Sequence, residues 1–311
     1  MTLVAVWVQK NETLRQLNVV SDSRLSGGES WDACPKVVPL PRPATVIAMS
    51  GSATEAYAFL LQAINACTLL DGHVSGRTDI SYLARKLKDV YSDSRNHVKD
   101  LPRTQSKADT PTLDVVLAGW SWRRSRFEGY SYSYGTDGSL EMKRLSELDE
   151  DRRYGIYFFG DAAPFARGRS RELLRERGLW PVADGIAVPP AYQWEPLEIV
   201  LEAVQNPDLR TVGGVPQITS AYQYGETESF VWEDDQQARF YGGRPILEKE
   251  RSDRRILSMN DGAARVRFSE SASVSPAQDV RDAKKPNVLT DPPTPTETAG
   301  CNEFKDPREP Q

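Results

Sequence analysis

The alternation of apolar and polar positions predicts a chain that begins with strands and then alternates strand groups with helices. Residues 3–8 form an apolar run with three valines, which is typical of a strand buried on both faces. Polar residues 9–13 predict a turn into a second strand at 17–21, so the chain begins with a hairpin. Further strands are expected at residues 36–40, 44–49, 113–122, 127–134, 139–144, 154–159, 217–224 and 229–232.

Helices are predicted between these strand groups. Ser52 and Glu55 match a capping box, in which a hydroxyl and a carboxylate each accept a hydrogen bond from a free backbone N–H. Apolar residues then recur at helical spacing after Glu55, on one face of the helix. The remaining helices are expected at about 79–97, 163–177 and 196–205. This order favours an α+β fold in which two packed sheets are flanked by helix layers.

The composition divides the chain at about residue 248. Residues 1–248 carry the periodic segments and are predicted to form one domain. Residues 249–311 include a stretch rich in Ser, Pro, Asp, Glu and Thr, with few aromatic residues. Such a composition buries too little apolar surface to fold, so a disordered acidic tail is predicted.

Composition and charge disfavour several classes of protein. The 311 residues carry a formal net charge of −5, which disfavours a nucleic-acid binder. No run of about 18 apolar residues suggests a membrane span, and the N-terminus lacks a signal peptide, so a cytoplasmic protein is expected. Cys34, Cys67 and Cys301 form no CxxC pair, so neither a disulfide framework nor a zinc site is expected, and no cofactor is indicated.

Histidine is scarce in this chain. Only His73 and His97 are present, and both lie in polar segments. A Ser-His-Asp triad or a histidine metal site would have to use these two residues, so both are disfavoured. A hydrolase with this sequence needs a base other than histidine.

Several short segments together resemble the proteasome β subunits and the bacterial HslV-type proteases. They occur in the order of that family and cover about residues 1–205. The segments are Met1–Val6, Ser21–Arg24, Lys36–Val37, Met49–Ala56, Tyr134–Ser139 and Phe159–Ala166.

The resemblance implies a four-layer αββα sandwich and the chemistry of an N-terminal-nucleophile hydrolase. Thr2 would be the nucleophile once Met1 is removed, because its freed α-amine can accept the hydroxyl proton without a histidine. Lys36 would place a positive charge beside Thr2, and Asp22 would orient Lys36. The backbone N–H of Gly51 would donate to the oxyanion. Asp161 stands where the family has a serine near the nucleophile, and would pair with Lys36 or raise the pKa of the α-amine.

Each of these residues also fits a structural interpretation. Asp22 and Gly51 suit turns, and Lys36 suits a solvated strand edge. Aligning the aliphatic run directly with the family places Met1 in the nucleophile position. Because strand side chains alternate between faces, Thr2 would then point away from the pocket. Two further segments are read as structural: 120–134 as a half-exposed strand rather than a nucleic-acid stacking surface, and 212–217 as a turn.

The sequence therefore predicts a threonine-type hydrolase acting on a peptide or small amide. The resemblance further implies a homo-oligomeric ring and an ATPase ring or other regulator as partner, with no nucleic-acid or membrane partner. Two alternatives stay open: a non-catalytic proteasome-like scaffold or sensor that keeps Met1, and an amidase of the same fold acting on a small molecule.

Overall fold

The computed structural model describes residues 2–10, 14–26, 29–99, 112–146, 148–149, 155–178, 192–250, 253–260 and 263–268. They belong to one compact unit, Met1–Ser269. Met1, most of the predicted linker at 103–112 and the tail from residue 270 onward lie outside the described residues.

The N-terminal hairpin is the centre of the first sheet. Its strands β1 (Val4–Lys10) and β2 (Arg15–Ser21) pair in an antiparallel register that sets Val4 opposite Ser21. The strand β1 is buried on both faces over most of its length, which confirms the reading of its apolar run. The sheet order is β10-β1-β2-β11-β12, completed by β10 (Ile156–Phe159), β11 (Gln217–Tyr222) and β12 (Thr227–Ser229).

The second sheet is an antiparallel meander that follows the chain. Its order is β5-β6-β7-β8-β9. The strands are β5 (Val37–Pro39), β6 (Thr45–Gly51), β7 (Leu113–Ser121), β8 (Arg126–Tyr134) and β9 (Leu140–Arg144). Valines of the N-terminal hairpin, including Val6 and Val19, pack in one apolar cluster with Val46 and Val116 of this second sheet. The two sheets therefore share a core.

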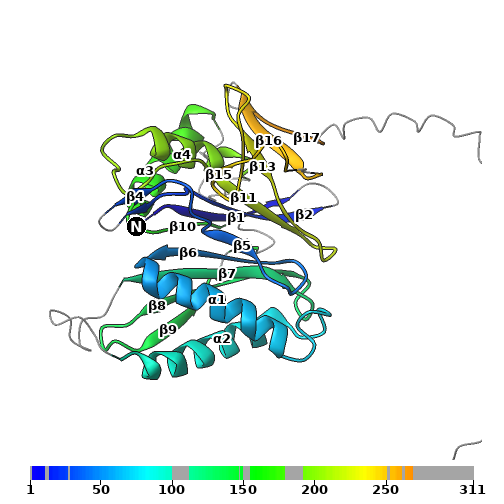
Figure 1. Cartoon of the computed structure of the whole chain (residues 1–311). Helices are drawn as coiled ribbons and strands as arrows, with labels where there is room; N and C mark the ends of the chain where they lie inside the picture. Colours follow the sequence, from blue (N-terminus) through cyan, green and yellow to red (C-terminus); the bar gives the residue numbers. More distant parts are fainter. Residues whose placement is uncertain are drawn as a thin grey trace, which may run out of the picture. The chain divides into compact units, whose positions relative to one another are not determined.

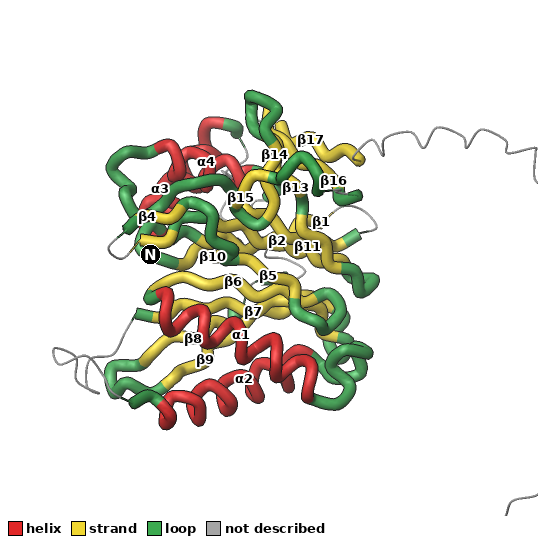
Figure 2. Tube along the Cα trace, viewed as in Figure 1, coloured by secondary structure: helices red, strands yellow, loops and turns green. Residues whose placement is uncertain are grey.

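Helices cover the other faces of these two sheets (Figures 1 and 2). On the second sheet, α1 (Ala53–Leu69) and α2 (Ile80–Ser94) bury Phe59 and Leu83 against β6 and β7, and α2 continues into a short 3₁₀ helix, Arg95–His97. On the first sheet, α3 (Ala163–Glu176) and α4 (Glu195–Gln205) cover the face of β1 that carries Trp7, and they share an apolar cluster with it.

The predicted four-layer αββα sandwich is wrong as the fold class. The structure is β-rich, with 37% strand and 26% helix, and it contains a third five-stranded sheet that the four-layer scheme lacks. That sheet has the order β15-β14-β13-β16-β17, with only β13 and β16 parallel. Its strands are β13 (Val231–Glu233), β14 (Arg239–Tyr241), β15 (Arg244–Pro245), β16 (Arg255–Asn260) and β17 (Ala263–Phe268). A small ribbon of β3 (Leu25–Ser26) and β4 (Ser30–Trp31) adds two more strands.

The third sheet also lies across the expected domain boundary. Residue 248 falls between β15 and β16, and the compact unit continues to Ser269. These strands are two to six residues long, and most of β17 is exposed. The predicted strand at 229–232 overlaps β13, but the pattern gives no signal for β14 to β17, because short strands with little apolar alternation lack a clear period.

The predicted capping box at α1 is wrong as well. Ser52 precedes the helix, but its side chain makes no capping hydrogen bond. The Glu55 carboxylate instead accepts hydrogen bonds from Tyr91 (2.7 Å) and Tyr134 (2.8 Å) and pairs with Arg95. This carboxylate ties α1 to α2 and β8, and tertiary contacts have replaced the local cap.

None of the helices in the described part of the chain combines the length and the apolar character that crossing a membrane requires.

The loop between α1 and α2 contains a histidine that should make the fold sensitive to acid. His73 is fully buried, and neither ring nitrogen has a hydrogen-bond partner among the described residues. Burial lowers the pKa of His73, and the charge of Arg42 lowers it further. The folded state therefore resists protonation. We expect the free energy of unfolding to fall as pH drops below the unfolded-state pKa of about 6.5.

Chemical denaturation of the wild type and of His73→Phe between pH 8 and pH 5 measures this contribution. The difference in stability between the two proteins should shift by at most about 1.4 kcal/mol per pH unit, in favour of the variant at low pH. Parallel pH profiles for the two proteins would contradict the assignment.

Candidate active site

The pairing of β1 with β2 brings Thr2 beside Asp22. Thr2 lies two residues before β1, and Asp22 directly follows β2. Asp22 N–H donates to the Leu3 carbonyl at 3.4 Å, and Leu3 N–H donates to Asp22 Oδ1 at 3.1 Å. The Thr2 hydroxyl donates to the same carboxylate oxygen. The register of one hairpin thus places a hydroxyl and a carboxylate in contact.

Lys36 reaches the same point from the second sheet. It precedes β5, and its backbone is held by Gln217, whose Oε1 accepts the Lys36 N–H at 2.9 Å. Its Nζ lies 3.1 Å from both Asp22 oxygens and donates a hydrogen bond to Thr2 Oγ1. The side chains of Lys36 and Asp22 are 2% and 0% exposed. Thr2, Asp22 and Lys36 therefore form one buried hydrogen-bonded cluster, as the sequence predicted.

The Thr2 side chain does not point away from this cluster, contrary to the expectation from strand alternation. Thr2 lies before the first residue of β1, so the alternation of that strand does not fix its direction. Its hydroxyl is satisfied twice, as a donor to Asp22 and as an acceptor from Lys36.

The electrostatics of the pair combine burial with attraction. Burial lowers the pKa of Lys36, and the Asp22 charge opposes this shift. Burial raises the pKa of Asp22, and the Lys36 charge and the N–H groups of Leu3 and Gly213 oppose that rise. A buried amine with a lowered pKa can give up its proton more readily than a solvated lysine.

Gly213 completes the shell of Asp22 and was missed by sequence reasoning. Its N–H donates to Asp22 Oδ2 at 3.1 Å, and Arg24 N–H donates to the same oxygen at 3.1 Å. Gly213 belongs to the segment 212–217, which was read as a plain turn. Gly213 and Asp22 are 191 residues apart, and no local pattern links them. The one available signal is a double glycine, Gly213-Gly214, three residues before the polar Gln217 that starts a buried strand.

Gly51 ends β6 just before α1, with a φ of 96°. A Cβ atom on Gly51 would lie 2.5 Å from the Thr112 carbonyl oxygen, so glycine is required here by the neighbouring strand. The neighbouring backbone alone therefore explains why residue 51 is a glycine. The position of Gly51 just ahead of a helix N-terminus remains as predicted.

Gly160, ahead of α3, approaches the other side of Thr2. Its φ is 93°, and a Cβ atom there would lie 2.0 Å from the Thr2 carbonyl oxygen. The next residue, Asp161, is exposed and accepts a hydrogen bond from Thr211. The charge of Asp161 acts on Lys36 only at a distance, because the ion pair of Lys36 is with Asp22. The expectation that Asp161 pairs with Lys36 is therefore wrong, because Asp22 holds the lysine.

Within the described residues, no group of three or more His, Cys, Asp or Glu side chains is placed to hold a metal ion. No family model and no curated protein matches this chain.

The buried ion pair makes a prediction about stability. Lys36→Met leaves the Asp22 carboxylate buried without its cation and should lower the free energy of unfolding by about 3–5 kcal/mol. Asp22→Asn should also be costly. The double variant should lose clearly less than the sum of the two single losses, because no unpaired buried charge remains.

Urea denaturation of the four proteins gives this double-mutant cycle. Lys143→Met removes the exposed ion pair of Lys143 with Glu141 and serves as the control, with an expected loss below about 1 kcal/mol. Additive losses for the double variant would show that Lys36 and Asp22 are not energetically coupled.

Proposed function

We propose that this chain is a threonine-type N-terminal-nucleophile hydrolase that cleaves an amide bond, most simply in a peptide. The observation that carries the proposal is the contact of the Thr2 hydroxyl with both Lys36 Nζ and the Asp22 carboxylate, beside the N-terminus. A hydroxyl is a weak nucleophile, and these neighbours are the kind that activate it. The resemblance to proteasome β subunits supports the same reading.

The reaction begins with removal of Met1, which converts the Thr2 nitrogen from an amide into an amine. That amine has a reference pKa of about 7.7–8.0 and is partly neutral at physiological pH. It takes the hydroxyl proton as Thr2 Oγ1 forms a bond to the substrate carbonyl carbon. Lys36 stabilises the negative charge on Oγ1 through its hydrogen bond, and Asp22 holds Lys36 in place.

The tetrahedral intermediate places its oxyanion toward the Gly51 N–H, ahead of α1, where the helix N-terminus contributes positive potential. The C–N bond of the substrate then breaks, and the leaving amine takes the proton from the Thr2 amine. An ester on Thr2 Oγ1 remains. A water molecule deprotonated by the same amine attacks this ester, releasing a carboxylate and restoring the hydroxyl.

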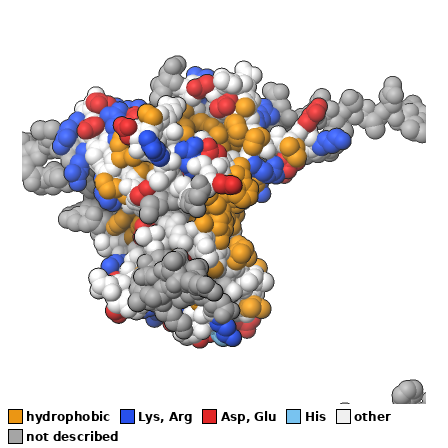
Figure 3. Space-filling view, turned by 60° about the vertical axis from the view of Figure 1, so that its left-hand side comes forward, with side chains coloured by type: hydrophobic (Ala, Val, Ile, Leu, Met, Phe, Trp, Pro, Cys, Tyr) orange, Lys and Arg blue, Asp and Glu red, His pale blue; other side chains and the backbone are white. Residues whose placement is uncertain are grey.

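An assembly of several copies and an ATPase regulator are part of this proposal, because the resembling family works in rings. Large apolar side chains are exposed on this chain, among them Trp31 (64%), Leu69 (83%) and Tyr224 (72%). Figure 3 shows a band of apolar side chains on one face. Such surface is typical of contacts between proteins.

A specific observation favours the alternative, a non-catalytic subunit that keeps Met1. Thr2 is only 1% exposed, and its hydroxyl is already saturated with hydrogen bonds. In that case the cluster is a structural clamp between the two sheets.

Mass spectrometry of the intact protein, before and after a β-lactone probe, distinguishes the two proposals. The hydrolase should lack Met1 and gain one acyl group, because only a free N-terminal threonine is activated in this way. Thr2→Ser should still be labelled and Thr2→Ala should not. Thr68→Ala, on the exposed face of α1, should be labelled like the wild type. A protein that retains Met1, or loses Met1 and stays unlabelled, is the non-catalytic subunit.

A further inference from the structure

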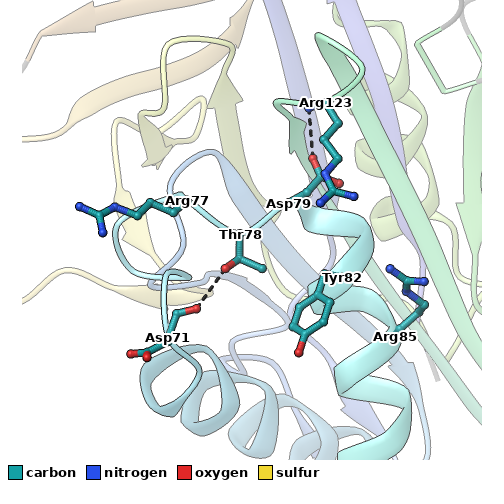
Figure 4. Close-up of a pocket in the computed structure, with 7 residues that line it drawn as sticks. All are labelled: Asp71, Arg77, Thr78, Asp79, Tyr82, Arg85 and Arg123. Atoms are coloured by element: carbon teal, nitrogen blue, oxygen red, sulfur yellow. Dashed lines mark hydrogen bonds between the residues drawn. The ribbon is translucent and has the colours of Figure 1, made fainter.

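A cavity of about 320 Å³ lies between the α1–α2 loop, the first turns of α2 and the turn from β7 to β8 (Figure 4). Its walls include Arg77, Arg85 and Arg123 together with Thr78 and Tyr82. Its volume lies at the lower end of the range of small-molecule pockets, roughly 300–1,000 Å³. The cavity opens beyond the C-terminal end of α1, whereas Gly51 precedes its N-terminal end. The 17 residues of α1 span about 25 Å, so this cavity is separate from the Thr2 cluster.

The three arginines of this cavity differ from most arginines of the described chain. Elsewhere the guanidinium commonly meets a carboxylate within 4 Å, as in the pairs Arg95–Glu55, Arg169–Glu202 and Arg255–Glu228. Neither Arg77 nor Arg85 nor Arg123 forms an ion pair with any residue that the structure describes. Arg85 Nε donates only to the neutral Ser81 carbonyl, at 3.3 Å. The guanidinium groups of these three arginines thus have no carboxylate within ion-pair distance in the described part of the chain.

Two acidic residues also line this cavity, so its wall carries three arginines and two carboxylates, a net positive balance. Asp79 is buried and serves as the N-cap of α2, accepting from Ser81 N–H (3.0 Å) and from the Ser121 hydroxyl (2.8 Å). The Asp71 carboxylate lies on the far side of Thr78 from Arg85 and Arg123 (Figure 4). In the same view the side chains of Arg85 and Arg123 flank the start of α2 on one side, and Arg77 extends to the other.

A fourth cation lies behind the wall of the cavity. Arg42 is fully buried, and its Nε donates to the Thr78 carbonyl at 3.0 Å. Its other hydrogen bonds go to neutral oxygens of Pro43, Thr45 and Trp120. Burial lowers the pKa of Arg42 to about 10, so it stays charged at neutral pH. The charge of Asp79 opposes this shift, so Arg42 and Asp79 partly balance each other behind the cavity.

We propose that this cavity is a binding site for a phosphate group, either free or carried by a small phosphorylated molecule. Guanidinium groups match the oxygens of phosphate in charge and geometry, and two of them balance a dianion. The volume leaves space for the body of a small ligand. The ring of Tyr82, which is 41% exposed, provides a flat wall for that body.

Calorimetric titration of the full-length protein tests the site, with inorganic phosphate, glycerol 1-phosphate and acetate at constant ionic strength. Phosphate or its ester should bind saturably, and acetate should bind much more weakly. Arg85→Gln with Arg123→Gln should weaken phosphate binding about tenfold or more, because two charge-assisted contacts are lost. Arg265→Gln is the control, since Arg265 is an exposed arginine on β17, away from the cavity, and changes the net charge in the same direction.

Tighter binding of the ester than of inorganic phosphate identifies a phosphorylated small molecule as the ligand, and the reverse identifies free phosphate. The proposal is overturned if binding does not saturate, if acetate binds as tightly as phosphate, or if Arg265→Gln weakens binding as much as the double variant. Circular dichroism of each variant confirms that the fold is intact in every comparison.

Discussion

The ion pair between Asp22 and Lys36 is the constraint on which the site depends. Asp22 ends the N-terminal hairpin in the first sheet, and Lys36 enters the edge strand of the second sheet. Burying two charges at 2% and 0% exposure is costly unless their remaining hydrogen bonds are made. The Asp22 carboxylate accepts hydrogen bonds from the backbone N–H groups of Leu3, Arg24 and Gly213. Lys36 Nζ donates a further hydrogen bond to the Thr2 hydroxyl. Any change of register in the hairpin would break this arrangement.

Two glycines let the backbone close around Thr2. Gly51 and Gly160 each sit at a junction from a strand to a helix, and both need a positive φ. Gly160 packs against the Thr2 carbonyl. Burial raises the pKa of Asp114, and the Gly160 backbone N–H opposes that rise. Asp114 lies opposite Ser50 in the pairing of β7 with β6. Gly160 at the end of the first sheet thus lies next to both Thr2 and Ser50, so the ends of the two sheets meet near Thr2.

Much of the fold and the centre of the candidate site could be predicted from the sequence. Apolar periodicity located the strands of the first two sheets and all four long helices, because these elements bury broad apolar faces. A family resemblance points to Asp22 and Lys36. The hairpin register brings Asp22 to Thr2, and the packing of the second sheet brings Lys36. Four strands of the third sheet, β14 to β17, escape prediction because they are short or mostly exposed. The cap of α1 was mispredicted because Glu55 bonds to two tyrosines from other elements. The contact of Gly213 with Asp22, and the gathering of three arginines at one cavity, join residues that are far apart in the sequence. No local pattern of a single sequence reveals such contacts.

The central claim is that Lys36 activates Thr2 for acyl transfer. The rate of acylation by a β-lactone, measured on protein that lacks Met1, tests this claim most directly when wild type and Lys36→Met are compared at a temperature where circular dichroism shows both folded. Removing one stabilising donor from a reacting oxygen costs about 10²–10³ in rate, and a loss of that size is predicted here. An unchanged acylation rate in folded Lys36→Met would contradict the account.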